Sequence, residues 1–484
     1  MTLARSAKSV PVVLLAFAVL SCGGSKVATT HLPAKERLDL AVNRYYGADY
    51  AGSALALYAV MSSVPATEPI HDSAELYLAG SLAEMGFSQA GVELYLDTVA
   101  ARRAPELVAS ALAALDKLAR RRLADARRLV DLFFGDDYGE LPGDTAELVE
   151  YYQGIGEINH GFADWGARRL GKLSKSRQYY GWKARFALAV HRLAVRQDDG
   201  AAAILDGIIK DRAAPPSLVS DALLARARML YEQKDYRRAF EMYGRIRGVL
   251  TEMDPVLLER AWAGVSTGGE RRALGMLVGL EAPIYRGLMA PERDLMRTIA
   301  LRDLCQYRLA HLAVVEFREK YQSVLAAIKV RKPLSEVHEL RQAALRRVDL
   351  VPSQRWLAVL EKERAEVGRI ADRGLRNLLI KIHDARAKAL ATQVEQELRT
   401  GTEALADELL AIDEKMSIID YELGIGLFKK VAESKTGRTV ESSKVVIPAS
   451  SEKVYYRHHG EYWSDELQDY SVMVRDRCIR ERPQ

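Results

Sequence analysis

The apolar positions of residues 223–246, LLARARMLYEQKDYRRAFEMYGRI, predict two short helices joined by a turn at Asp235 and Tyr236. Steps of four and three place Leu223, Ala227 and Leu230 on one face of the first helix, and Ala239, Tyr243 and Ile246 on one face of the second. A small residue, Ala227 or Ala239, lies on each apolar face. We expect the two helix axes to cross closely there, because a larger side chain would push them apart.

Small residues recur along two thirds of the chain at intervals of 34 to 41 residues. They are Ser53, Ala90, Ala126, Ala167, Ala203, Ala239, Ala273 and Ala310. A period near 36 residues predicts an array of about eight helix pairs over residues 36–321, since one pair cannot bury its apolar face alone. The alternative is an irregular α-helical domain rich in alanine.

These units resemble the tetratricopeptide repeat, a helix pair of about 34 residues with small and aromatic residues at these places. The next unit, LLERAWAGVSTGGERRALGMLVGL, repeats Ala261 and Ala273 in register. The resemblance implies an all-α solenoid whose first helices line a concave groove for protein partners. The register assigns six candidates to this groove: Arg192, Arg196, Arg228, Tyr231, Trp262 and Arg302.

Arginines around two aromatic rings suit an extended peptide with acidic groups or a terminal carboxylate. The alternative is that these long side chains coat solvated helix faces.

The N-terminus predicts export. Arg5 and Lys8 precede an apolar run over residues 10–20, which is too short to span a bilayer and has the anatomy of a signal peptide. VLSC at residues 19–22 resembles a bacterial lipobox, which implies lipidation of Cys22, removal of residues 1–21, and outer-membrane sorting because Gly23 follows. Residues 22–35 would then form a tether. The alternative is an ordinary secretory signal with a chance cysteine.

Two further cysteines, Cys305 and Cys478, would share a compartment in which disulfides persist. A bond between them would pin the C-terminal tail to the last helix pair. Alternatively, Cys305 is a small buried apolar residue and Cys478 is free in the tail.

Residues 322–432 carry two apolar series with alternating steps of four and three, the pattern of long packed helices. The series are Ala371, Leu375, Leu378, Ile382, Ala385 and Ala389, then Leu405, Leu409, Ile412, Met416, Ile419 and Leu423. Thr400-Gly401-Thr402 lies between them and predicts the turn of an antiparallel helical hairpin. One continuous helix and an intermolecular coiled coil are the alternatives.

The tail, residues 433–484, is polar at first and then aromatic, and Val472 and Val474 alternate with their neighbours as in a short strand. We expect its aromatic residues to dock the tail onto its own domain; a partner contact site is the alternative. Together with the lipobox and the repeats, the GEYWSDEL stretch resembles tetratricopeptide-repeat lipoproteins of myxobacteria, a group that includes gliding-motility lipoproteins.

The sequence contains no catalytic, cofactor or metal motif. His458 and His459 are adjacent, the other histidines are scattered, and no phosphate-binding or nucleophile-elbow pattern is present. Without such motifs no small-molecule substrate is expected. The net charge of +5 falls to +3 once residues 1–21 are removed, and with charges of both signs and a periplasmic location nucleic acid is not an expected partner.

The expectation is a non-enzymatic outer-membrane lipoprotein that faces the periplasm. As a scaffold it would bind other envelope proteins in an envelope-spanning machine, with gliding motility the most specific case. The alternative is an accessory lipoprotein for outer-membrane protein assembly or polysaccharide export.

Overall fold

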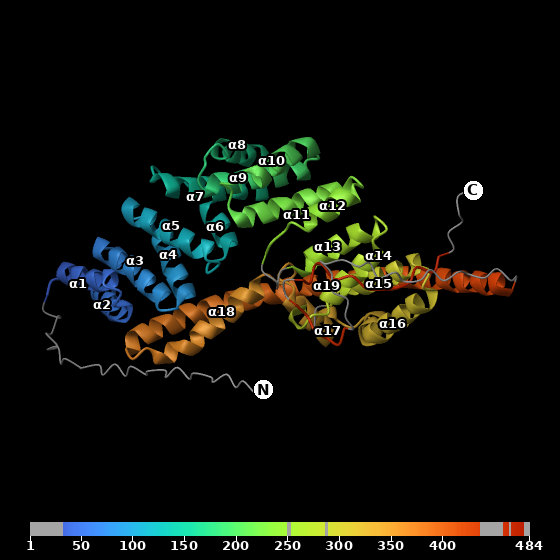
Figure 1. The fold of residues 1–484 in the computed structure, drawn as a ribbon. Helices are drawn as coiled ribbons and strands as arrows, with labels where there is room; N and C mark the ends of the chain where they lie inside the picture. The colour runs from blue at the N-terminus through green and yellow to red at the C-terminus, as the bar shows by residue number, and fades with distance from the viewer. Residues whose placement is uncertain (1–31, 249–252, 286–288, 436–457, 464–465, 479–484) are drawn as a thin grey trace, which may run out of the picture.

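The computed structural model describes residues 32–248, 253–285, 289–435, 458–463 and 466–478. Every regular element in these ranges is a helix, and consecutive helices pack pairwise (Figure 1). The expected all-α architecture of helix pairs is therefore confirmed. No helix of the described ranges has the length and apolar character needed to cross a bilayer.

Eight consecutive pairs account for the first sixteen α-helices of the described ranges. The pairs are α1 (Ala34–Tyr46) with α2 (Tyr50–Ser63), α3 (Pro69–Glu84) with α4 (Ser88–Ala101), α5 (Pro105–Arg120) with α6 (Ala126–Phe133), α7 (Gly143–Asn159) with α8 (Ala163–Leu173), α9 (Tyr179–Ala194) with α10 (Asp198–Lys210), α11 (Pro216–Glu232) with α12 (Tyr236–Tyr243), α13 (Asp254–Val265) with α14 (Glu270–Gly279), and α15 (Pro291–Asp303) with α16 (Tyr307–Lys329).

The first helices of neighbouring pairs also contact one another, from α1–α3 through α9–α11 and again at α13–α15. The first helices from α1 to α11 therefore share one inner surface of the array.

One turn geometry recurs in all eight pairs. A residue with positive φ ends the first helix, and the next backbone N–H donates back into that helix, as Asp235 does to the Leu230 carbonyl at 2.9 Å. In seven of the pairs a small residue follows five positions after the positive-φ residue, at Ser53, Gly91, Gly166, Ala201, Ala239, Ala273 and Ala310. The residue twelve positions earlier, in the first helix, is also small or short and is buried, namely Ala41, Ala79, Gly154, Ala189, Ala227, Ala261 and Thr298.

This register corrects four positions of the predicted series. Ala90 is buried, but its neighbour Gly91 occupies the helix crossing, where an added Cβ would lie 2.7 Å from the Ala79 carbonyl oxygen. Ala203 is exposed, and Ala201 takes its place. Ala167 is half-buried beside Gly166, and Ala126 is exposed at the start of α6. The third pair has no small-residue crossing, because Arg127 stands at that position.

The predicted hairpin turn at Thr400–Thr402 is wrong. Helix α19 runs without interruption over Arg373–Lys435, so the continuous-helix alternative holds. Gly401 is buried in it, and a Cβ there would lie 3.2 Å from the Leu350 Cβ. The glycine therefore serves close packing and not a turn. All six residues of the second apolar series are buried, whereas Ala371, Ala385 and Ala389 of the first are exposed.

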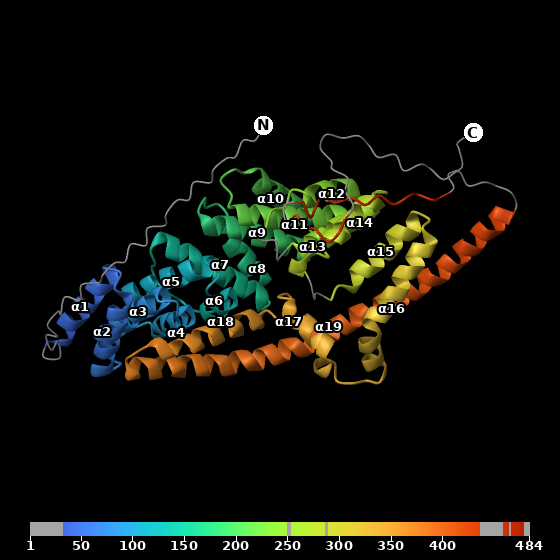
Figure 2. The same cartoon turned by 60° about the horizontal axis from the view of Figure 1, so that its bottom comes forward.

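Two short 3-10 helices and two more α-helices lead into α19. They are η4 (Leu334–Glu336), α17 (His338–Arg346), α18 (Ser353–Glu366) and η5 (Val367–Arg369). Helix α18 packs antiparallel along the first part of α19, so a hairpin does form, one helix earlier than predicted. Figure 2 shows α19 running from beneath α2 and α4 to the last pair, α15 and α16, and projecting beyond it.

The tail is docked on the last two pairs. Residues 471–478 are extended and lie on helices, so the predicted strand is absent from the described tail. The backbone N–H of Val472 donates to the Arg271 carbonyl at 3.0 Å, and that of Arg477 donates to the Leu304 carbonyl at 2.9 Å. The alternation is real, since every second residue from 472 to 478 is half-buried and the residues between are exposed.

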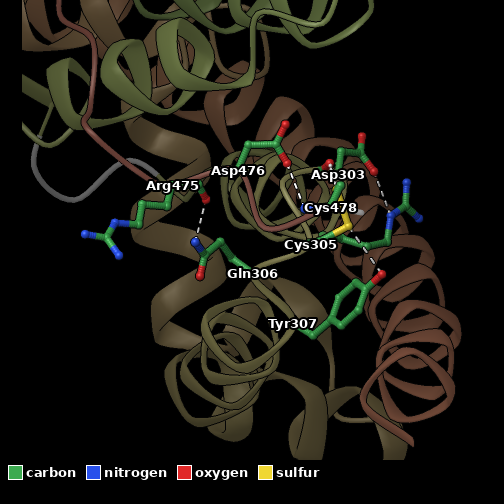
Figure 3. The surroundings of a disulfide bond; sticks show 8 residues. Asp303, Cys305, Gln306, Tyr307, Arg475, Asp476 and Cys478 are labelled. Atoms are coloured by element: carbon green, nitrogen blue, oxygen red, sulfur yellow. Dashed lines mark hydrogen bonds and ion pairs between the residues drawn. A yellow bond between two sulfur atoms is a disulfide. The ribbon is translucent and has the colours of Figure 1, made fainter. Parts of the chain in front are cut away.

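Cys305 and Cys478 are joined by a disulfide with 5.0 Å between their Cα atoms (Figure 3). Cys305 is the positive-φ residue of the last pair, so the bond anchors the tail at the α15–α16 turn. Gln306 strengthens this anchor because its side chain donates to the Arg475 carbonyl.

Candidate protein-binding surface

The six groove candidates do not form one site. Arg192 and Arg196 lie at the α9–α10 turn, where an Arg192 Nη1 donates to the Gly200 carbonyl at 3.3 Å and Arg196 is the positive-φ residue. Arg228 is engaged by Glu259 of the next first helix through two bonds of 2.6 and 2.9 Å. Arg192 therefore braces its own helix pair, Arg228 joins two neighbouring pairs, and Arg196 is exposed at its turn.

The other candidates are also occupied. Trp262 and Arg302 do come together, in a pocket whose other wall is α19. Arg302 donates to Glu422 of α19 at 3.1 Å, and Trp262 donates to Glu292 of α15 at 2.8 Å. Tyr231 stacks edge-on against Tyr236, with 5.0 Å between ring centroids.

A different cluster does lie on the inner surface, and the sequence reading missed it. Tyr151 and Tyr152 of α7 meet Tyr179 and Tyr180 of α9, with ring centroids 5.1 to 6.1 Å apart. The Nζ atom of Lys183 lies 4.5 Å from the Tyr151 ring centroid and within 5.8 Å of the other three. We call this group of four tyrosines and one lysine the tyrosine cage.

Helix α5 supplies a second cation at the edge of the tyrosine cage. The Arg120 guanidinium lies 4.2 Å from the Tyr179 ring centroid and pairs with Asp116 one turn earlier at 2.8 Å. Asp116 also accepts a hydrogen bond from the Tyr180 hydroxyl. Asp116 therefore holds one wall of the cage in place, while Arg120 remains exposed at its rim.

The four tyrosine rings make the environment of Lys183 apolar, and their faces also attract its ammonium group. Burial lowers its pKa from the ordinary lysine value to about 8, which the nearby charges of Asp116 and Asp221 only partly oppose. Ring faces attract an ammonium group but do not neutralise it. The cage thus presents a half-buried cation surrounded mainly by aromatic rings.

The sequence did carry a signal for the tyrosine cage. Two Tyr-Tyr pairs stand in consecutive first helices, and the lysine follows the second pair by one helical turn. Counted back from the positive-φ residues Gly161 and Arg196, the two pairs lie seven residues apart, which is two helical turns, so they share one face of the first helices.

The described ranges offer one group with metal-ligand spacing, His71, Asp72 and Glu75 of α3, whose ligand atoms lie within 4.8 Å of one another. Asp72 already forms an ion pair with Arg103 at 2.9 Å. Burial, followed by the charges of Asp97 and Asp72, raises the pKa of Glu75 to about 7. An arginine within the group and a partly protonated carboxyl do not suit a cation. His458 and His459 are exposed in the tail.

Comparison with known proteins adds no relative. No family model matches the chain, and a search of curated proteins returned no similar sequence. The predicted lipidation site, Cys22, and most of the tether lie outside the described residues.

Proposed function

We propose that this protein is a non-enzymatic scaffold that binds extended, acidic segments of partner proteins on the inner surface of its helix pairs. The observation that carries the proposal is the tyrosine cage, in which the half-buried ammonium group of Lys183 lies among four aromatic rings beside the exposed Arg120. The site differs from the predicted groove in position, but it calls for the same ligand chemistry.

A carboxylate is the group that completes the cage. It would neutralise Lys183 and reach Arg120, whose guanidinium is already oriented by Asp116. The half-buried rings of Tyr151 and Tyr179 offer apolar contact on either side of it. Because α5, α7 and α9 lie next to one another, an extended segment crossing them would contact several pairs at once.

The cellular address is part of the proposal. The lipobox-like residues 19–22 support a lipid anchor on Cys22 and an outer-membrane position facing the periplasm. The disulfide between Cys305 and Cys478 suits an oxidising compartment. In that setting the partners would be other envelope proteins, and an envelope-spanning gliding-motility machine is the most specific form of the proposal. An accessory role in outer-membrane protein assembly or polysaccharide export is the alternative.

Peptide binding tests the site. Extended peptides that carry Asp or Glu, or a free C-terminal carboxylate, should bind the full protein, whereas the Asn, Gln or amidated versions should bind at least about ten-fold more weakly. Lys183→Glu should weaken binding of the acidic peptides to a similar degree. Lys210→Glu is the matched control, because Lys210 is exposed at the end of α10, outside the cage.

The pH dependence gives an independent readout. With a pKa of about 8, Lys183 loses its proton as the pH rises from 7 to 9, so affinity for acidic peptides should fall over that range. A bound carboxylate favours the charged lysine and should move the midpoint upward. Equal binding of acidic and amidated peptides, or a Lys183→Glu protein that binds both as tightly as the wild type, would contradict the proposal.

A further inference from the structure

Residues 466–478 of the tail, which we call the docked segment, lie on α13 and α14 as an extended chain. Their backbone rests on a glycine pair of α14. A Cβ on Gly279 would lie 2.6 Å from the Leu467 carbonyl oxygen, and one on Gly275 would lie closer still to the carbonyl oxygen of Tyr470. In the described part of the tail Leu467 is the one buried residue. The contact is therefore mainly one of backbone against helix.

Two arginines beside the glycine pair hold the docked segment. The Arg260 Nη1 atom donates to the Gln468 carbonyl at 3.1 Å, and the Arg271 Nε atom donates to the Val474 carbonyl at 2.8 Å. Arg260 also forms an ion pair with Asp469 at 3.8 Å. Backbone carbonyls are common to every peptide, whereas the carboxylate selects an acidic one. We call the two arginines and the glycine pair the arginine face.

The docked segment offsets the positive charge of the arginine face. Burial lowers the pKa of Arg260; the charge of Asp469 opposes that shift, whereas the charges of Arg272 and Arg247 add to it. Asp469 is thus the carboxylate that compensates a crowded group of arginines. Without the docked segment the face would favour another anionic ligand.

The disulfide between Cys305 and Cys478 fastens the docked segment at its end (Figure 3). Without this bond, one buried leucine and a few hydrogen bonds would have to offset the conformational entropy of the whole segment. The bond keeps the segment at a high effective concentration beside the face. Neither cysteine is fully buried, so the bond is open to thiol exchange. Reduction should therefore free the segment.

We propose that the arginine face is a second binding site for an extended acidic segment of a partner protein, and that the tail occupies this site until the disulfide is reduced. The ligand chemistry follows the docked segment, in which an apolar residue, Leu467, stands two positions before an acidic one, Asp469. The site is separate from the tyrosine cage, so either proposal can fail alone.

A dithiol supplies the two electrons and two protons of the reduction. Its thiolate attacks one cysteine sulfur, the bond between Cys305 and Cys478 breaks, and the other cysteine leaves as a thiolate. The second thiol of the reductant then displaces the first cysteine from the mixed disulfide. The reductant leaves as its own disulfide, and both cysteines end as thiols.

Hydrogen exchange of the detergent-solubilised, full-length protein tests the release. In the oxidised protein the amides of Val472 and Arg477 donate to carbonyls of the helix pairs. After reduction with dithiothreitol they should exchange at least about ten-fold faster. Cys478→Ser should match the reduced wild type with or without dithiothreitol. Protection that survives reduction would overturn the proposal.

A capped peptide with the sequence of residues 466–474, ELQDYSVMV, tests the ligand. Binding is measured in the Lys183→Glu protein, so that the tyrosine cage does not contribute. The peptide should bind the reduced form at least about ten-fold more tightly than the oxidised form. Asp469→Asn in the peptide, or Arg260→Gln in the protein, should weaken this binding about ten-fold. Arg237→Gln is the control, because Arg237 is exposed on α12 away from the contacts of the docked segment.

Two results of the peptide experiment would contradict the second site. Equal binding to the oxidised and reduced forms would show that the peptide binds elsewhere. Dimer formation on reduction, without peptide binding, would show that the face takes the tail of a second copy. Because the tyrosine cage is disabled in this protein, neither result bears on the binding proposed for the cage.

Discussion

Single small residues determine how closely backbones approach in this protein. At the first helix crossing, the Ser53 hydroxyl donates to the Ala41 carbonyl at 2.9 Å, and at the fourth, a Cβ on Gly166 would meet the Gly154 carbonyl oxygen at 2.4 Å. The same principle fixes the tail. Gly275 and Gly279 lie on one face of α14, and the tail backbone rests directly on them.

Gly275→Ala tests the tail contact, because its Cβ would fall 2.1 Å from the Tyr470 carbonyl oxygen. The tail must move, at a cost of about 1–3 kcal/mol. Gly207→Ala is the control: no atom lies within 4 Å of its Cβ, so it should stabilise α10 by about 0.5–1 kcal/mol. Hydrogen exchange should show faster exchange of the Val472 amide in the first variant alone. Unchanged exchange in Gly275→Ala would mean that the tail is not seated on α14.

At the scale of elements, the α18–α19 hairpin is attached to the second pair through a helix N-terminus. The N-termini of α2 and α12 are capped by their own Asp49 and Asp235. That of α4 is capped by Glu363 of α18, which accepts from the Ser88 hydroxyl at 2.7 Å and from the Gln89 N–H at 3.0 Å. Glu363 also contacts the fully buried His383 at 3.2 Å, so one carboxylate joins three helices.

Glu363→Ala should therefore cost about 2–4 kcal/mol, since it leaves buried polar groups on α4 and α19 without a partner. Glu361→Ala, an exposed position on the same helix, should change stability by less than about 0.5 kcal/mol. Urea unfolding measures both. Equal effects of the two substitutions would show that the hairpin is held by apolar packing alone.

For the whole molecule, packing between helices that are neighbours in sequence could be predicted, whereas packing between distant segments could not. The helix pairs were predictable because each buries its apolar face against its neighbours in sequence, with Ala227 and Ala239 meeting within one unit. The course of α19 could not be predicted, because a glycine such as Gly401 is compatible both with a turn and with close packing. Its contacts with Ala344 and Leu350, more than fifty residues earlier in the chain, decide between the two. The prediction of a groove lined by free arginines failed for the same reason. Arg228 pairs with Glu259 and Arg302 pairs with Glu422, and both glutamates come from other helices.

Helix α19 is about 95 Å long and packs against both ends of the array, whereas none of α7–α14 is among its main contacts. Its packing changes between Leu390, which lies against α18, and Val394, which joins the core of the last pairs. Thr392 lies between them and is exposed. If α19 holds the two ends at a fixed separation, breaking it there should let the array move.

Thr392→Pro removes one backbone hydrogen bond of α19 and clashes with the preceding turn, at a cost of about 3 kcal/mol. The radius of gyration of the Thr392→Pro protein, measured by small-angle X-ray scattering, should exceed that of the wild type, because a straight helix no longer joins the first and last pairs. Thr392→Ala, which loses only a side-chain bond to the Lys388 carbonyl, should leave the scattering unchanged. A proline variant with wild-type scattering and lowered stability would show that the helix pairs keep their shape alone, and that α19 adds stability without setting the spacing of the two ends.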